Sequence, residues 1–207
     1  MAEIKYSEFD ENYYAMVIAN PYIDGMHINP ICSFMQIYNE HSMYEPKDKS
    51  LKDVQFMDFL WEGYTFYISE KIKKQLDEFI PTRKNAVDYK GTMFFDSIVY
   101  FKTGEVYNPY YALYTPKFKF IEKKYLPNID EQHDGTTGLE KITNIVLKPS
   151  AIKKVPEEMR TVFRMDFHKV KWLFCLEHIK DKIESANATG IKLVKSKDMD
   201  WSYANKK

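Results

Sequence analysis

Short apolar runs rich in aromatic and β-branched residues recur along the chain and predict strands. The predicted strands cover residues 13–19, 64–68, 92–101, 105–114, 118–121, 142–147, 161–165, 170–175 and 191–194. The first run stops at Asn20-Pro21, because proline has no amide hydrogen for a continuing ladder. Thr103-Gly104 separates the third and fourth runs, which predicts an antiparallel hairpin.

Three other stretches have apolar residues at helical spacing. These residues are Ile31, Phe34, Met35 and Tyr38 in the first stretch, Ile72, Leu76 and Phe79 in the second, and Ile179, Ile183 and Ala186 in the third. Asn29 and Ser69 precede the first two stretches as N-cap residues. Pro81 should end the second helix, and Gly190 should release the chain from the third into the last strand.

Together these elements predict an α+β fold, a mostly antiparallel sheet with a few amphipathic helices packed on it. The length suits a single domain over residues 1–207, with a polar connection at 44–53 that sets apart an N-terminal segment, 1–53. Residues 66–79 align without gaps on residues 173–186, each a strand followed by a helix. Either the chain holds two related strand-helix lobes, or two helices rich in Lys and Glu align by chance.

Composition and net charge limit the kinds of protein that this sequence can encode. Hydrophobic residues make up 44% and charged residues 29%, which is typical of a folded globular chain. Thirty basic residues balance thirty acidic ones, so no net field favours nucleic acid. Neither an export signal nor a membrane span is expected. Cys32 and Cys175 lie far apart in apolar surroundings, which predicts reduced thiols and a cytoplasmic protein.

Motifs for catalysis or cofactor binding are not found in the sequence. The five histidines have no metal-ligand spacing, and no phosphate-binding glycine loop or nucleophile elbow occurs. We therefore expect no catalytic residue, no metal and no cofactor. The densest polar cluster is Asp130, Glu131, His133 and Asp134, within the loop 127–138. It is either a solvated acidic loop or, as the alternative, the centre of a metal-dependent hydrolase or transferase.

Aromatic residues alternate with lysines over residues 110–125. Such a composition occurs in platforms that stack single-stranded nucleic acid, in ordinary amphipathic strands and in protein interfaces. Zero net charge disfavours the nucleic-acid interpretation.

The C-terminal order of strand, strand, helix and glycine-opened strand resembles the terminal signature of immunity protein family eleven of bacterial polymorphic toxin systems. The residues that carry this resemblance are Phe163-Arg164-Met165, residues 172–175 (WLFC) and residues 188–193 (ATGIKL). The strand at 142–147 and the helix at 69–79, preceded by Tyr67-Ile68, are similar to earlier units of the family. The similarity extends over residues 64–201.

The resemblance implies a cytoplasmic, non-enzymatic protein that binds a cognate toxin and occludes its active site. An inhibitory interface of this kind usually buries about 1,200–2,000 Å² and depends on a few aromatic or charged anchors. Exposed aromatic residues and loops are where such anchors concentrate. The candidate partner-binding residues are therefore Tyr107, Tyr110, Tyr111, Tyr114, Asp130, Glu131 and Asp134.

Overall fold

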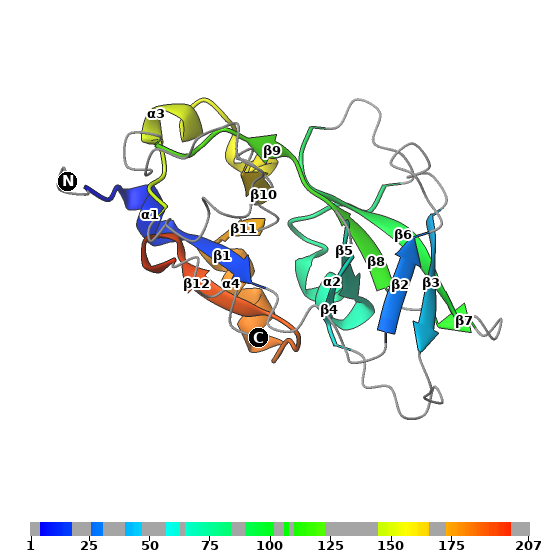
Figure 1. Ribbon diagram of the computed structural model, residues 1–207. Helices are drawn as coiled ribbons and strands as arrows, with labels where there is room; N and C mark the ends of the chain where they lie inside the picture. Colours follow the sequence, from blue (N-terminus) through cyan, green and yellow to red (C-terminus); the bar gives the residue numbers. More distant parts are fainter. Residues whose placement is uncertain are drawn as a thin grey trace, which may run out of the picture. The chain divides into compact units, whose positions relative to one another are not determined.

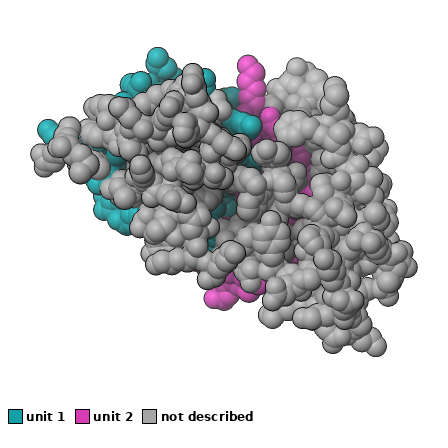
Figure 2. All heavy atoms as spheres, in the orientation of Figure 1, with its two compact units in different colours: residues 1–17, 116–180, 192–207 teal, residues 18–115, 181–191 magenta. Residues whose placement is uncertain are grey.

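The chain forms an α+β fold of mainly antiparallel sheets and a few short helices (Figure 1). The computed structural model describes residues 5–17, 26–30, 40–46, 57–62, 65–83, 90–101, 106–107, 110–122, 145–165 and 173–199. Two compact units divide the chain (Figure 2). Unit 1 comprises residues 1–17, 116–180 and 192–207, and unit 2 comprises residues 18–115 and 181–191. The expected boundary at residue 53 does not separate the units, and the single domain over 1–207 stays a prediction.

Unit 1 contains a five-stranded sheet in the order β12-β1-β11-β10-β9. Its strands are β1 (Tyr13–Val17), β9 (Lys117–Phe118), β10 (Val162–Met165), β11 (Leu173–Leu176) and β12 (Lys192–Lys195). The pairs β1–β11, β1–β12 and β10–β11 are antiparallel, whereas β9 and β10 run parallel. The N-terminal strand is thus enclosed by two strands from the last quarter of the chain.

All residues of β1 and β11 are buried. Their sequences, YYAMV and LFCL, are continuously apolar, as expected for strands covered on both faces. The core of unit 1 gathers around the ring of Phe163, which meets the rings of Tyr13, Phe120 and Phe174 at 5.3, 5.1 and 5.8 Å between centroids. Aromatic pairs at such distances add to the stabilisation that comes from burial alone. Much of the chain's high aromatic content is therefore structural.

Short helices flank the strands of unit 1. They are α1 (Glu8–Asn12), α3 (Pro149–Ile152) and two 3₁₀ turns, Glu157–Met159 and Ser196–Asp198. The longest helix, α4 (Glu177–Ser185), begins directly after β11, and its residues from Asp181 onward belong to unit 2. Ile179 and Ile183 of α4 are buried, as their spacing predicts.

Unit 2 contains a larger sheet in the order β2-β3-β6-β8-β5-β4, with β7 paired to β6. Its strands are β2 (Met26–Pro30), β3 (Glu40–Pro46), β4 (Phe59–Glu62), β5 (Thr65–Ser69), β6 (Met93–Phe101), β7 (Val106–Tyr107) and β8 (Tyr110–Tyr114). The predicted hairpin is confirmed, because β7 and β8 both return antiparallel along β6. Helix α2 (Glu70–Leu76) follows β5 and packs against β5 and β8.

Two expectations about the N-terminal part of unit 2 need correction. The predicted exposed connection at 44–53 begins inside a strand, because β3 runs to Pro46 and pairs with β2 and β6. Strand pairing uses backbone groups, so a polar sequence can take part in it. Asn29 and Pro30 lie in β2 rather than before a helix, and the predicted helix after them lies outside the described residues.

Helix α2 ends earlier than predicted. It stops at Leu76, and the amides of Phe79 and Ile80 both donate to the carbonyl oxygen of Leu76. Pro81 disfavours a helical conformation at the residue before it, so the chain turns away first. Ile80, rather than Phe79, is then fully buried.

The predicted strand at 142–147 is reduced, within the described residues, to a bridge between Ile121 and Leu147. The connection at 148–158 that follows it contains α3 and a 3₁₀ turn.

Candidate functional site

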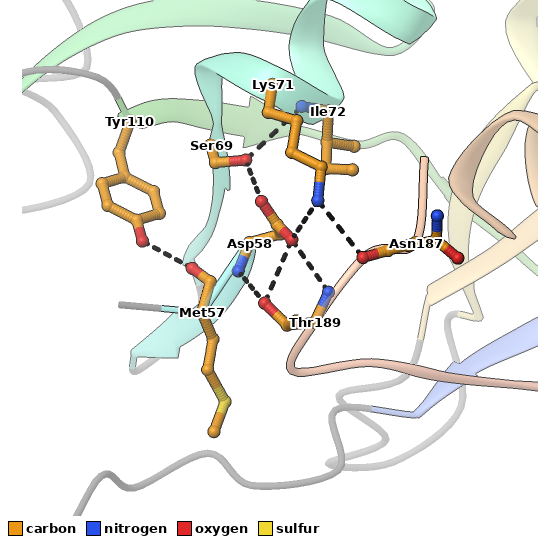
Figure 3. Close-up of polar contacts among 8 residues, drawn as sticks. All are labelled: Met57, Asp58, Ser69, Lys71, Ile72, Tyr110, Asn187 and Thr189. Carbon is orange, nitrogen blue, oxygen red and sulfur yellow. Dashed lines mark hydrogen bonds and ion pairs between the residues drawn. The ribbon is translucent and has the colours of Figure 1, made fainter. Parts of the chain in front are cut away.

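The carboxylate of Asp58 is the centre of a polar cluster in unit 2 (Figure 3). Its Oδ1 accepts a hydrogen bond from Ser69 Oγ at 2.7 Å. Its Oδ2 accepts from the amide and the hydroxyl of Thr189 at 2.9 and 3.0 Å, and pairs with Lys71 Nζ at 3.1 Å. Asp58 itself is 8% exposed. One buried carboxylate therefore receives four donors.

Hydrogen bonds donated by backbone amides join the same three segments. The Asp58 amide donates to Thr189 Oγ1 at 2.9 Å, and the Ser69 amide donates to the Asp58 carbonyl at 2.9 Å. The Phe59 amide donates to the Thr189 carbonyl at 3.2 Å. The cluster thus ties the start of β4, the start of α2 and the turn after α4 to one another.

Ser69 has a second role as the N-cap of α2, as its position in the sequence predicts. Its Oγ accepts a hydrogen bond from the amide of Ile72 at 3.4 Å. One hydroxyl therefore both caps the helix and donates to Asp58. This places α2 at a fixed position relative to β4.

The turn that carries Thr189 begins with a regular helix ending. The amide of Asn187 donates to the Glu184 carbonyl, and the amide of Ala188 donates to the Ile183 carbonyl. Asn187 has a φ of 49°. This pair of bonds with a left-handed residue is the Schellman arrangement, in which Asn is one of the tolerated residues. The ending directs the chain toward Asp58.

We expect Asn187→Ala to lower the free energy of unfolding by about 1 kcal/mol, because alanine is disfavoured at positive φ. Asn187→Gly should leave stability within about 0.5 kcal/mol of the wild type. Urea unfolding followed by circular dichroism measures both variants. A loss in the glycine variant as large as in the alanine variant would show that the Asn side chain, rather than its backbone conformation, matters.

Gly190 follows Thr189 with a φ of 79°. A Cβ atom at this position would lie 2.7 Å from the Phe59 carbonyl oxygen and 2.8 Å from Met57 Cβ. Both the backbone conformation and the close approach therefore require glycine. As predicted, Gly190 lies just before the last strand, β12, whereas the helix has already ended at Ser185. No sequence pattern indicated its contact with residues 57–59.

Opposing effects set the protonation of Asp58. Burial alone would raise the pKa of its carboxyl group, but hydrogen bonds from Ser69, Thr189 and Lys71 outweigh this and hold the pKa below its ordinary value. The carboxylate is therefore ionised at neutral pH. A group with a lowered pKa that is already occupied by four donors is a poor proton acceptor. The cluster favours fixing the fold over acid-base chemistry.

A second buried carboxylate, in unit 1, is used in the same way. Asp10 is 0% exposed. Its Oδ2 accepts from the amide and hydroxyl of Ser7, both at 2.7 Å, and its Oδ1 accepts from the Leu147 amide at 2.8 Å. The Arg160 guanidinium donates to the Tyr13 hydroxyl and to the Val155 carbonyl. These buried polar groups also hold segments together.

The predicted partner-binding tyrosines lie on β7 and β8, which both pair with β6, and those described differ in burial. Tyr110 is 2% exposed and its hydroxyl donates to the Met57 carbonyl, so it belongs to the core of unit 2. Tyr111 and Tyr114 are half-buried. Tyr107 lies in β7, and its side chain is outside the described part. Asp130, Glu131, His133 and Asp134 also lie outside the described residues.

Lys73 of α2 covers one of these tyrosines. Its Nζ lies 4.8 Å from the centroid of the Tyr111 ring and 5.8 Å from that of Phe94, and it pairs with Asp77 at 2.6 Å. The Lys73 side chain is 13% exposed. A lysine held over an aromatic ring is partly ordered in advance. Tyr114 packs edge-on against Phe95 at 6.5 Å.

Sequence reasoning missed Asp58, Lys71 and Thr189 as a group. Ser69 and Gly190 were identified from cap and turn signals, but Asp58 carries no local motif, and Thr189 lies 131 positions later. Among the residues that the structure describes, no three His, Cys, Asp or Glu side chains form a metal-binding group. None of the described helices has the length and apolar character that crossing a bilayer requires.

Comparison with known proteins gives no relative. No protein-family model matches the chain, and no curated protein matches it. The resemblance of the C-terminal cassette to an immunity family therefore stays a prediction based on the residues named above.

Proposed function

We propose that this chain is a non-catalytic immunity protein of the cytoplasm, which binds one cognate bacterial toxin and neutralises it by covering the toxin's active site. The observation that carries the proposal is the use of Asp58, whose bonds with Ser69, Lys71 and Thr189 hold the scaffold together. A sheet held in place by such hydrogen bonds suits a binding protein, because little freedom is lost when the partner docks on it. The resemblance of residues 163–193 to the immunity family indicates that the partner is a toxin.

Tyr111 and Tyr114, which lie on opposite faces of β8, are our two candidate residues for contact with the toxin. Both rings are half-buried, so part of each remains accessible. Tyrosines that are already packed lose little side-chain entropy on binding, which is why they are frequent among interface anchors. Lys73, which is paired with Asp77, packs over the Tyr111 ring and helps to hold it in place.

The test is coexpression with the product of the neighbouring gene, scored by growth rescue and by native mass spectrometry of the complex. We expect a complex of fixed stoichiometry in which toxicity is lost. Tyr111→Ala should weaken binding about tenfold or more, as for an interface anchor. Tyr110→Phe is the matched control, because its hydroxyl is used inside unit 2, and it should bind as the wild type does.

Unchanged affinity in both Tyr111→Ala and Tyr114→Ala would remove these two residues from the proposal. Metal-dependent turnover by the chain alone, abolished by His133→Ala, would overturn the non-catalytic function and favour the hydrolase or transferase.

A further inference from the structure

Residues 181–191 complete unit 2, although 65 residues of the chain, 116–180, separate them from the rest of that unit. They comprise the end of α4, the turn at Asn187 and the approach to β12. Several contacts attach this segment. Lys182 pairs with Glu78 at 2.7 Å, Lys71 donates to the Asn187 carbonyl at 3.2 Å, and Thr189 bonds to Asp58 and Phe59.

These attachments differ in their exposure to water. The Lys182 and Glu78 side chains are 41% and 57% exposed, and such surface pairs hold weakly. The Lys71 side chain is 50% exposed, whereas that of Asp58 is 11% exposed. Hydrogen bonds to a shielded carboxylate are the stronger kind. Among the polar contacts described for this segment, those to Asp58 should therefore contribute most to holding it.

The segment also has a turn conformation that its own residues define. Two residues with positive φ, Asn187 and Gly190, bracket Ala188 and Thr189. Hydrogen bonds within the segment fix its shape, because the amides of Ala186, Asn187 and Ala188 donate to carbonyls of residues 182–184. Ile183 is its buried apolar side chain, at 1% exposed. A segment with few buried apolar contacts and its own internal hydrogen bonds can open without the sheet unfolding.

We propose that residues 182–190 form a detachable strap, and that Asp58 is the latch that holds this strap on unit 2. The strap opens as a local unit, while the strands β4, β5 and β8 stay paired. Opening exposes Ser69 and the Asp58 carboxylate to water. The device is a conformational one and does not depend on the proposed toxin binding.

Hydrogen exchange on the full chain, resolved to single amides by NMR, tests the strap. The strap probes are the amides of Thr189, which donates to Asp58, and of Phe59, which donates to the Thr189 carbonyl, because both bonds break when the strap opens. The reference probes are the amides of Ile80 and Phe94 in the same unit. In the wild type the strap probes should exchange faster than the reference probes. Asp58→Asn should speed the strap probes by about tenfold or more, the scale of losing a charge-assisted hydrogen bond, and leave the reference probes nearly unchanged.

Asp77→Asn is the matched control, since it removes the same charge from an ion pair of α2 that lies outside the cluster. It should change neither set of probes. If Asp58→Asn does not fold, Thr189→Val removes the hydroxyl contacts with little change of shape and should give the same pattern to a smaller degree. Strap and reference probes that speed up together, or strap probes that do not respond, would overturn the proposal.

Discussion

Gly190→Ala should destabilise unit 2 by about 2 to 5 kcal/mol. Alanine at positive φ costs about 1–2 kcal/mol, and an extra carbon in a packed site costs about 1–3 kcal/mol more. The new Cβ would meet the Phe59 carbonyl at 2.7 Å and Met57 Cβ at 2.8 Å. Backbone cannot yield as a flexible side chain can, so β4 or the turn must shift. Chemical denaturation measures the loss.

Asn187→Ala separates the two causes of that loss. Asn187 also has a positive φ, but its side chain is exposed. Its alanine variant therefore carries the conformational cost without the clash. A Gly190→Ala variant no less stable than Asn187→Ala would mean that the close approach to residues 57–59 is not maintained in solution.

Asp58→Ala should lower the free energy of unfolding by about 3 kcal/mol, because it leaves the donors of Ser69 and Thr189 without their acceptor. Lys71→Met is the matched control. Its side chain is half exposed, so its loss should cost less than about 1 kcal/mol. Equal losses in the two variants would show that the ion pair, rather than the hydrogen bonds from Ser69 and Thr189, provides the stabilisation.

The same carboxylate should make stability depend on pH in the acid range. The pKa of Asp58 in the folded chain lies below its ordinary value of 3.8, since hydrogen bonds to the carboxylate outweigh the effect of burial. The folded state therefore binds fewer protons than the unfolded state. The contribution of Asp58 is complete above the ordinary pKa and is lost as the pH falls through the lowered one.

Asp58→Asn isolates this effect from other acids such as Glu11, whose pKa is also lowered, by its hydrogen bond with Lys197. The difference in unfolding free energy between wild type and Asp58→Asn should be constant near neutral pH and shrink below about pH 4. A difference that stays constant down to pH 2 would contradict the assigned role.

Local patterns predicted most of the elements but not how they assemble. Three features depend on neighbouring residues, which a sequence pattern records: helix α2 with its cap at Ser69, the hairpin of β6 with β7 and β8, and Gly190 before the last strand. The division into two units depends on residues 181–191 joining residues 18–115. Nothing local specifies that pairing, because it arises from contacts between distant positions.

For the residues of the candidate site too, local patterns predicted the strands but not the contacts between distant positions. Tyr110 and Tyr111 are neighbours of one residue type, yet one is buried and the other half-buried. The alternation of side chains along a strand predicts that they lie on opposite faces, but it does not predict which face is covered. Asp58 looked like any polar residue before an apolar run, since its partner Thr189 is 131 positions away.

The position of β1 between β11 and β12 has a consequence for the order in which the chain can fold as it is made. Residues 13–17 leave the ribosome early, whereas their partners lie at 173–176 and 192–195. At about 5–20 residues per second, the apolar run YYAMV waits on the order of ten seconds for a pairing strand. Unit 2 likewise lacks residues 181–191 until late in synthesis. Each unit therefore needs residues beyond position 180 before it is complete, so the two units are completed almost together.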